Sequence, residues 1–318
     1  MAAASLRGRI VTLDIGGTRQ RARICAARDG LPPLLVVQAG PGLALLNEVA
    51  KFQQRLRLEE EFSVTYWDQR GCGPAPLRDA RSVSMQSQVD DVRAAIRWLA
   101  NESGQRVTVL AVSLGATYAL QAAAREASST KALVAVSIDT DMAAGDAAAA
   151  DFLRQAASRG GNPRIAKSIA SLPPPPYLEP KHLQDRARLL TDLGGIENVK
   201  GFGELLRGAL LSMVRTYGLL GTVSTLRNMS AIQAMLLPEL ATFDLFADWP
   251  RPAVPVHYIF GSGDALVSQS LVQRVADRLG RDDTLVVLPG ARHMVHFDEP
   301  AAVRSIVVRA QRAILSGT

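Results

Sequence analysis

The chain has 318 residues, of which 47% are hydrophobic and 21% are charged. This balance is typical of a globular protein and argues against disordered and fibrous classes, and the length fits one large α/β domain or a domain carrying an insertion. Lys and Arg outnumber Asp and Glu by 36 to 30, but the excess is dispersed along the chain. Its densest cluster, Arg19, Arg21 and Arg23, has no interleaved aromatic residues, so we expect no nucleic-acid partner.

Cysteine content and targeting signals bear on the compartment. The two cysteines, Cys25 and Cys72, are too few for a disulfide framework and are not spaced as a zinc or redox pair. No segment reaches the ~20 apolar residues of a membrane span, and residues 1–9 lack the apolar run of a signal peptide. We therefore expect a cytoplasmic protein that does not associate with membranes.

Two β-like runs, residues 9–13 and 21–25, flank Gly16 and Gly17 and predict an antiparallel hairpin at a sheet edge. Beyond it, apolar runs of strand length alternate with segments of helical length, which predicts an α/β fold with a mostly parallel central sheet flanked by helices. The predicted strands are residues 34–37, 63–67, 107–112, 132–138, 254–260 and 284–288. The predicted helices are residues 44–58, 85–99, 114–125, 268–279 and 301–315.

The alternation of strands and helices is interrupted between residues 142 and 249. This stretch is rich in Ala, Leu and Gly and shows helical rather than strand patterning. We interpret it as a helical insertion. Residues 1–141 and 250–318 would then form one core domain, and residues 142–249 a second, helical domain. Two separate smaller domains remain possible on length alone, but a single split core is the simpler account.

Ser113 stands where a predicted strand runs directly into a predicted helix, with Ala111 and Gly115 two residues to either side. This context matches a nucleophile elbow in which Ala replaces the first Gly. Small neighbours let the strand and the helix approach each other closely at the sharp turn. Ser158 and Ser168 have similar neighbours but no preceding strand, so context selects Ser113. On this motif alone, the serine could instead simply cap the helix.

A serine hydroxyl becomes a good nucleophile when a histidine, oriented by a carboxylate, removes its proton. Asp264 and His293 follow Ser113 in the chain order expected for an elbow serine. They lie beyond the strands predicted at 254–260 and 284–288, at whose carboxyl ends α/β sheets place their sites. Two alternatives stay open: Asp264 can be an ordinary turn carboxylate, and His296 competes with His293 as the base.

A glycine- and proline-containing loop, residues 38–42 (Gln-Ala-Gly-Pro-Gly), follows the strand predicted at 34–37. Its backbone N–H groups can face the space above Ser113 and stabilise a developing oxyanion. Taken alone, such a loop is more often a plain turn. Its place after an early strand favours the oxyanion role.

These motifs resemble those of the proline iminopeptidase branch of the α/β-hydrolase family. The family's loop reads His-Gly-Gly-Pro-Gly, from which this chain departs at Gln38 and Ala39. Residues 68–73, Asp-Gln-Arg-Gly-Cys-Gly, resemble the Asp-x-Arg-Gly-x-Gly signature of that branch. Residues 290–293, Gly-Ala-Arg-His, resemble its approach to the catalytic histidine.

The resemblance implies an α/β-hydrolase fold with a helical cap formed by the insertion. It also implies an oxyanion hole made by the backbone N–H groups of Gly40 and Leu114. With Ser113 as nucleophile, His293 as base and Asp264 as the orienting acid, the expected reaction is acyl transfer and hydrolysis without a metal or an organic cofactor. Aminopeptidase action on a small N-terminal residue is the function that the resemblance implies.

Other functions stay open at this point. A carboxylesterase, a lactone hydrolase or an amide hydrolase could act on a small molecule through the same residues, and a non-hydrolytic protein could use the fold to bind a ligand. In each case the expected partner is a small molecule or a short peptide. The sequence does not determine the oligomeric state.

Two further groups of charged residues have both a functional and a structural interpretation. Asp68 and Arg70 are expected to form a salt-bridged turn that braces the loop below the site. An aminopeptidase must also pair the protonated amine of its substrate with a carboxylate, because an unpaired charge in a closed site is costly. Five acids of the insertion are available for this, and all five could equally be solvated surface charges: Glu179, Asp185, Asp192, Glu197 and Glu204.

Overall fold

The computed structural model describes residues 7–75, 83–159 and 162–313. One eight-stranded sheet forms its centre, with the strand order β1-β2-β4-β3-β5-β6-β7-β8. The strands are β1 (Arg7–Ile15), β2 (Thr18–Ala26), β3 (Pro33–Val37), β4 (Ser63–Trp67), β5 (Val107–Val112), β6 (Thr130–Val136), β7 (Val256–Gly261) and β8 (Thr284–Leu288).

The first two strands form the predicted antiparallel hairpin, and β1 is one edge of the sheet. Gly16 and Gly17 have φ angles of 56° and 70°, a conformation that glycine adopts without steric cost and that a tight hairpin turn needs. The strand β2 also pairs antiparallel with β4, whereas every later neighbouring pair is parallel. The prediction of a mostly parallel sheet is therefore confirmed.

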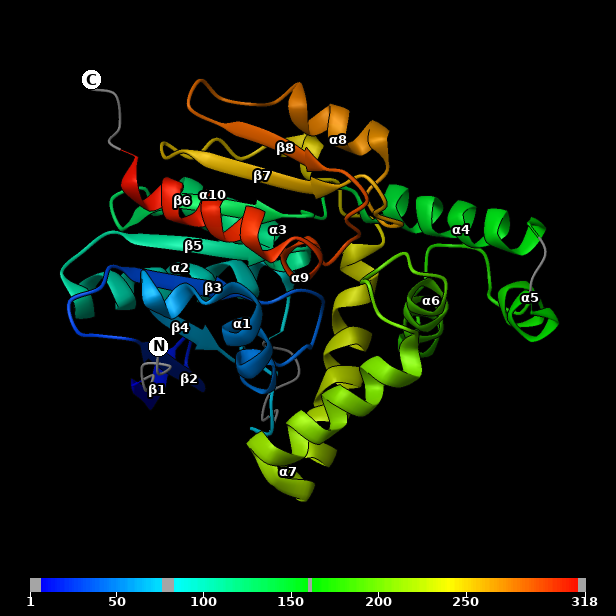
Figure 1. Cartoon of the computed structure of the whole chain (residues 1–318), viewed down its shortest axis with the longest axis horizontal. Coiled ribbons are helices and arrows are strands. Elements are labelled where there is room, and N and C mark those ends of the chain that lie inside the picture. The colour runs from blue at the N-terminus through cyan, green and yellow to red at the C-terminus, as the bar shows by residue number, and fades with distance from the viewer. Residues whose placement is uncertain (1–6, 76–82, 160–161, 314–318) are drawn as a thin grey trace.

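Helices cover both faces of this sheet (Figure 1). Apolar residues of α2 (Met85–Ser103), α3 (Leu114–Arg125) and α8 (Gln269–Ala276) pack with one face in a single buried cluster. Those of α1 (Val49–Leu56) and α10 (Pro300–Arg312) pack with the other face. Both faces of the central strands are thus buried, which explains why their sequences are apolar runs and do not alternate with polar residues.

The helix predicted at residues 44–58 is shorter in the structure. A short 3₁₀ turn, Leu46–Glu48, precedes α1, and α1 ends at Leu56. Arg57 then adopts a left-handed conformation, with φ 51° and ψ 39°, which breaks the helical path. The last predicted helix agrees in position with α10, and its predicted end at residue 315 lies outside the described residues.

The insertion between β6 and β7 is helical, as predicted. It contains α4 (Met142–Ser158), α5 (Pro163–Ala170), α6 (Pro180–Asp192) and α7 (Phe202–Leu240). Gly218 kinks α7, with φ 72° and ψ 176° inside the helix. Figure 1 shows these four helices beyond the ends to which β7 and β8 point. The boundaries of a separate cap domain at residues 142 and 249 stay a prediction.

No helix in the described ranges has both the length and the apolar character of a membrane-spanning segment. Residues 1–6, on which the expectation about targeting partly depends, lie outside the described residues.

Candidate active site

Ser113 occupies the turn between β5 and α3, whose bounds agree with the strand and the helix predicted around it. Its backbone has φ 53° and ψ −127°, a strained conformation for a residue with a side chain. Its backbone N–H donates to the carbonyl of Val136 on β6, at 2.8 Å. The serine is buried and does not cap α3 with its hydroxyl. The geometry is therefore that of a nucleophile elbow, and the helix-cap alternative does not apply.

The turn needs a residue without a side chain at position 115, two residues after the serine, because the backbone of another loop lies against it. A Cβ at this glycine would lie 2.1 Å from the carbonyl oxygen of Gln38 and 2.9 Å from that of Val37. Real Cβ atoms do not approach backbone oxygens so closely. The elbow and the loop after β3 thus touch each other directly, through a contact that only glycine allows.

We predict that Gly115→Ala lowers kcat/KM by about 100-fold, because a displacement of the Gln38 loop by about 1 Å is enough to misplace catalytic groups. The measurement is hydrolysis of a 4-nitrophenyl ester, together with the midpoint of thermal unfolding. Gly203→Ala is the matched control, since a Cβ there would meet nothing within 4 Å. Near wild-type turnover in Gly115→Ala would show that this contact does not set the geometry of the site.

The structure brings Ser113, His293 and Asp264 together, although they are far apart in the sequence. The Nε2 atom of His293 lies 2.9 Å from the Oγ atom of Ser113. On the other side of the ring, Nδ1 lies 2.9 Å from Oδ2 of Asp264 and 3.1 Å from its Oδ1. A carboxylate at Nδ1 favours the tautomer with its proton there, which leaves Nε2 free to accept the serine proton.

The Asp264 carboxylate is fixed in place by the turn that carries it. Its Oδ1 accepts hydrogen bonds from the backbone N–H groups of Leu266 at 2.8 Å and Val267 at 3.0 Å. These bonds orient the carboxylate toward His293. The turn interpretation of Asp264 is therefore compatible with the acid role, which stays a prediction.

Charges around His293 decide its protonation. Burial acts to lower the pKa of His293, but the adjacent carboxylates of Asp264 and Asp139 outweigh burial and hold the pKa above its usual value of 6.5. A base with a raised pKa is stronger, and a larger fraction of it is protonated near neutral pH. Hydrolysis that uses neutral His293 should therefore rise with pH through that raised value.

His296, the competing histidine, forms no hydrogen bond to Ser113 within the described chain. Its ring stacks on Phe52, with a centroid distance of 5.2 Å. Burial, with smaller contributions from Lys51 and His293, lowers the pKa of His296 to about 3. His296 is thus a neutral core residue, and the geometry favours His293 as the base.

The backbone of the loop after β3 suits the expected oxyanion hole. Leu114 is the first residue of α3, so its N–H has no carbonyl within the helix to bond. Gly40 has a φ of 69°, which turns the chain sharply in this loop. The side chain of Gln38 accepts the N–H of Ala39 through Oε1 at 3.0 Å, so that N–H is already engaged. The oxyanion role of Gly40 and Leu114 stays a prediction.

Asp68 and Arg70 both stabilise the region below the site, but not as one salt-bridged turn. Arg70 forms a buried ion pair with Asp91 of α2, at 2.7 Å. Asp68 accepts the backbone N–H groups of Leu45 and Leu46 through Oδ1, at 2.7 and 2.9 Å. Its Oδ2 accepts the hydroxyl of Tyr217 on α7, at 2.8 Å. Asp68 therefore connects the insertion to the segment that follows the loop at residues 38–42.

A loop of the insertion bonds to the segments that carry Asp264 and His293. The N–H of Ala265, next to Asp264, donates to the carbonyl of Gly195 at 3.2 Å, and the N–H of Met294, next to His293, donates to that of Ile196 at 2.8 Å. The loop between α6 and α7 thus helps to hold the positions of Asp264 and His293.

The five acids suggested for amine binding have other partners or lie at the surface. Glu197 is buried and pairs with Lys51, at 2.6 Å. Asp185 pairs with Lys181, at 2.7 Å. Asp192 and Glu204 are exposed and accept backbone N–H groups at the start of α7, and Glu179 is exposed near His182. The charges with the largest effects on the pKa of His293 are those of Asp264, Asp139 and Arg186, and none of the five acids is among them.

Sequence reasoning missed Asp139. Its Oδ2 atom lies 2.9 Å from the Oγ atom of Ser113, as close as His293 does on the other side. A signal was present: Asp139 directly follows the strand predicted at 132–138, much as Asp264 follows the strand predicted at 254–260. Burial raises the pKa of Asp139, against the opposing effects of His293, the Ser113 hydrogen bond and Arg186.

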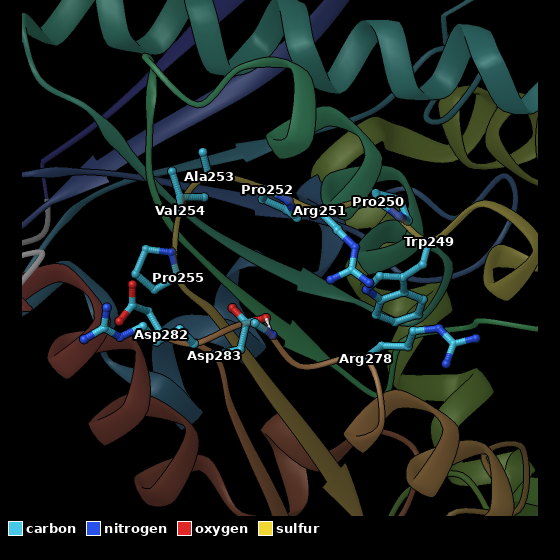
Figure 2. A pocket seen from close by; sticks show the side chains of 12 residues that line it. Trp249, Pro250, Arg251, Pro252, Ala253, Val254, Pro255, Arg278, Asp282 and Asp283 are labelled. Atoms are coloured by element: carbon cyan, nitrogen blue, oxygen red, sulfur yellow. Dashed lines mark hydrogen bonds between the residues drawn. The ribbon is translucent and has the colours of Figure 1, made fainter. Parts of the chain in front are cut away.

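A pocket in another part of the molecule is separate from this cluster. Figure 2 shows that residues just before β7, including Val254 and Pro255, line it together with Arg278, Asp282 and Asp283 around the segment between α8 and β8. It therefore lies at the amino ends of the strands, whereas Ser113 lies at the carboxyl end of its strand. Within the described part of the chain, no group of three or more His, Cys, Asp or Glu side chains could hold a metal ion.

Comparisons with known proteins agree with this fold. A curated relative, the probable aminopeptidase YbaC of Bacillus subtilis (strain 168), is 22% identical over 310 residues, which cover 94% of this chain and 95% of that protein. The crystal structure of proline iminopeptidase from Mycobacterium smegmatis has a TM-score of 0.68 and 23% identity, covering 96% of this chain and 98% of the other.

A second solved structure, a proline iminopeptidase-related protein from Thermus thermophilus, has a TM-score of 0.65 and 22% identity, with coverage of 96% and 98%. The predicted resemblance to proline iminopeptidases is thus confirmed for the fold. The profile of the Alpha/beta hydrolase family matches residues 41–306, which is well over half of the chain. The chain belongs to the alpha/beta hydrolase family.

Proposed function

We propose that this protein is a serine hydrolase that acts by acyl transfer, as a proline iminopeptidase-like aminopeptidase. The observation that carries the proposal is the continuous chain of contacts from Asp264 through His293 to Ser113, with both distances from the ring at 2.9 Å. In a buried site, this series of contacts from carboxylate to imidazole to hydroxyl is the arrangement that converts a serine hydroxyl into a nucleophile.

In the proposed reaction, Ser113 Oγ attacks the scissile carbonyl while His293 Nε2 takes the serine proton. The backbone N–H groups of Gly40 and Leu114 stabilise the negative oxygen of the tetrahedral intermediate. His293 then gives the proton to the leaving amine, and the acyl group remains on Ser113. Water, deprotonated by His293, releases the acid product and restores the serine.

The choice of an aminopeptidase over an esterase depends on the family resemblance. The solved relative from M. smegmatis is named a proline iminopeptidase, and the B. subtilis relative a probable aminopeptidase. Both span almost the whole length of this chain, including the insertion. We therefore propose that the substrate is a short peptide or aminoacyl amide with a free N-terminal residue, most naturally proline.

We expect the protein to cleave proline β-naphthylamide and to leave N-acetylproline β-naphthylamide intact, because the acetylated substrate has lost the charge that an exopeptidase recognises. The measurement is the release of fluorescent naphthylamine at a fixed enzyme concentration and over a range of substrate concentrations. Fast hydrolysis of 4-nitrophenyl acetate with no cleavage of any free-amine aminoacyl amide would contradict the peptidase and leave an esterase. No turnover of either class would favour a ligand-binding protein.

A further inference from the structure

Asp139 has no role in the reaction described so far, although its carboxylate touches the proposed nucleophile. It is not a second orienting acid, because Nδ1 of His293 is already bonded to Asp264. Its side chain instead accepts the hydroxyl of Ser113 itself, at 2.9 Å. A carboxylate that faces the nucleophile in this way also faces the acyl part of the substrate.

The backbone holds Asp139 in this place at a cost. Ser137, two residues earlier, has a φ of 45°, an unfavourable value for a residue with a side chain. Its N–H is fixed to the carbonyl of Ile259 on β7, at 2.8 Å. The hydroxyl of Thr117 on α3 donates to the carbonyl of Asp139 itself. Backbone strain of this kind is concentrated at functional sites, where surrounding contacts maintain it.

The charges around Asp139 do not balance. Asp139 and Asp264 both raise the pKa of His293, whereas Arg186 of the insertion lowers the pKa of both Asp139 and His293. Arg186 is itself engaged in a buried ion pair with Asp146. When His293 is neutral, as catalysis requires, the charged groups are the carboxylates of Asp139, Asp264 and Asp146 and the guanidinium of Arg186. With all three acids ionised, the site would hold an excess of two negative charges, which a bound cation would stabilise.

We propose that Asp139 binds the protonated α-amine of the substrate and so determines its specificity; this rests on the serine hydrolase mechanism proposed above. The geometry suits an aminoacyl group: its amine nitrogen is separated from the scissile carbonyl carbon by two bonds of about 1.5 Å each. Asp139 Oδ2 lies only 2.9 Å from Ser113 Oγ. A substrate whose carbonyl carbon is within reach of that Oγ therefore has its amine close to the Asp139 carboxylate. For proline, the ring NH₂⁺ supplies the donor.

Binding of the amine would also free the nucleophile. The Ser113 hydroxyl has one proton and two acceptors at 2.9 Å, namely Asp139 and neutral His293. It can donate to only one of them at a time. An ammonium group, which can only donate, would engage the Asp139 carboxylate, and the serine proton would then point to His293. A substrate with a free amine thus aligns the serine with its base.

The test uses two isosteric substrates, the 4-nitrophenyl esters of proline and of tetrahydrofuran-2-carboxylic acid, in which an oxygen replaces the ring NH₂⁺. We expect the wild-type protein to prefer the proline ester in kcat/KM. In Asp139→Asn that preference should fall by about 10- to 100-fold, the loss expected for a hydrogen bond to a charged group. Most of the change should appear as a higher KM for the proline ester. The matched control is Asp185→Asn, a surface acid of the insertion, which should keep the wild-type preference.

A second measurement, the pH profile, distinguishes a direct effect of the Asp139 charge from a structural effect of its replacement. Asp264, Asp139 and Arg186 are the charged groups with the largest effects on His293, and Asp139 acts to raise its pKa. Asp139→Asn should therefore shift the rising limb of the pH profile for the neutral ester to lower pH. If Asp139→Asn does not fold, judged by its thermal unfolding, Asp139→Ala is measured in the same way.

Two results would overturn the role of Asp139. One is a ratio of kcat/KM for the two esters that is the same in Asp139→Asn as in the wild type, and the other is a wild-type protein without preference for the proline ester. Either result is distinct from failure of the peptidase function. Esters report amine recognition even if the protein cleaves no naphthylamide. Conversely, naphthylamide cleavage that survives in Asp139→Asn with its KM unchanged would keep the peptidase and exclude Asp139 as its amine-binding group.

Discussion

Ser113→Ala is expected to lower kcat by about four to six orders of magnitude for every substrate that the protein hydrolyses. The variant lacks the oxygen that would attack the carbonyl, and the residual rate would come from the oxyanion hole and from substrate binding. The same variant should lose all labelling by a fluorophosphonate probe, which reacts with an activated serine. Measured by intact mass and peptide mapping, the wild-type adduct should lie on Ser113.

Ser168→Ala is the control for this experiment. Ser168 also has small neighbours in sequence, but it lies on the exposed helix α5, and its hydroxyl donates to the carbonyl of Arg164 at 3.0 Å. Labelling and turnover should be unchanged in this variant. An adduct on Ser168 or Ser158, or active protein that carries no adduct, would contradict the assignment of the nucleophile.

The second large effect is expected for His293→Ala, which should reduce kcat by about four to six orders of magnitude, because the variant lacks the imidazole that takes the serine proton and passes it to the leaving group. In the wild-type protein, kcat/KM should rise with pH as His293 loses its proton. Asp264 and Asp139 hold the pKa of His293 above 6.5 against the effect of burial, so the midpoint of this rise should lie above that value. The measurement is kcat/KM for a neutral ester between about pH 5 and 9.

His296→Phe is the matched comparison, because His296 is buried three residues further on and stacks on Phe52. An apolar ring of similar shape should keep that packing, so turnover and its pH profile should remain those of the wild type. The opposite pattern, with activity retained in His293→Ala and lost in His296→Phe, would transfer the role of base to His296.

Much of the fold was predictable because its signals are local. The strand before Ser113 and the helix after it agree with prediction because a buried parallel strand is an unbroken apolar run and the following helix has its own period. The break in the helix at 44–58 was not predictable in this way. Arg57 is an ordinary helix former by propensity, and it adopts a left-handed conformation only in the context of the folded chain.

Partners that are distant in the sequence were harder to infer. Arg70 was expected to brace a turn with Asp68, but its buried ion pair is with Asp91, and Asp68 instead bonds Tyr217 of the insertion. Nothing in the local sequence distinguishes these partners, since any acid of the chain has the charge to pair with an arginine. Only the packing of α2 and α7 against this region selects them.

The sequence by itself determined the order of strands and helices along the chain and the helical insertion. It also predicted a role for Ser113, Asp264 and His293, because each follows a strand that local patterning reveals. The tertiary structure decided what surrounds them. It brought Asp139 to 2.9 Å from Ser113. The insertion acids that were candidates for amine binding instead bond other residues or lie at the surface. The physical reason is that a side chain's role depends on its distance and direction to other charges, and these arise only when parallel strands place their carboxyl ends side by side.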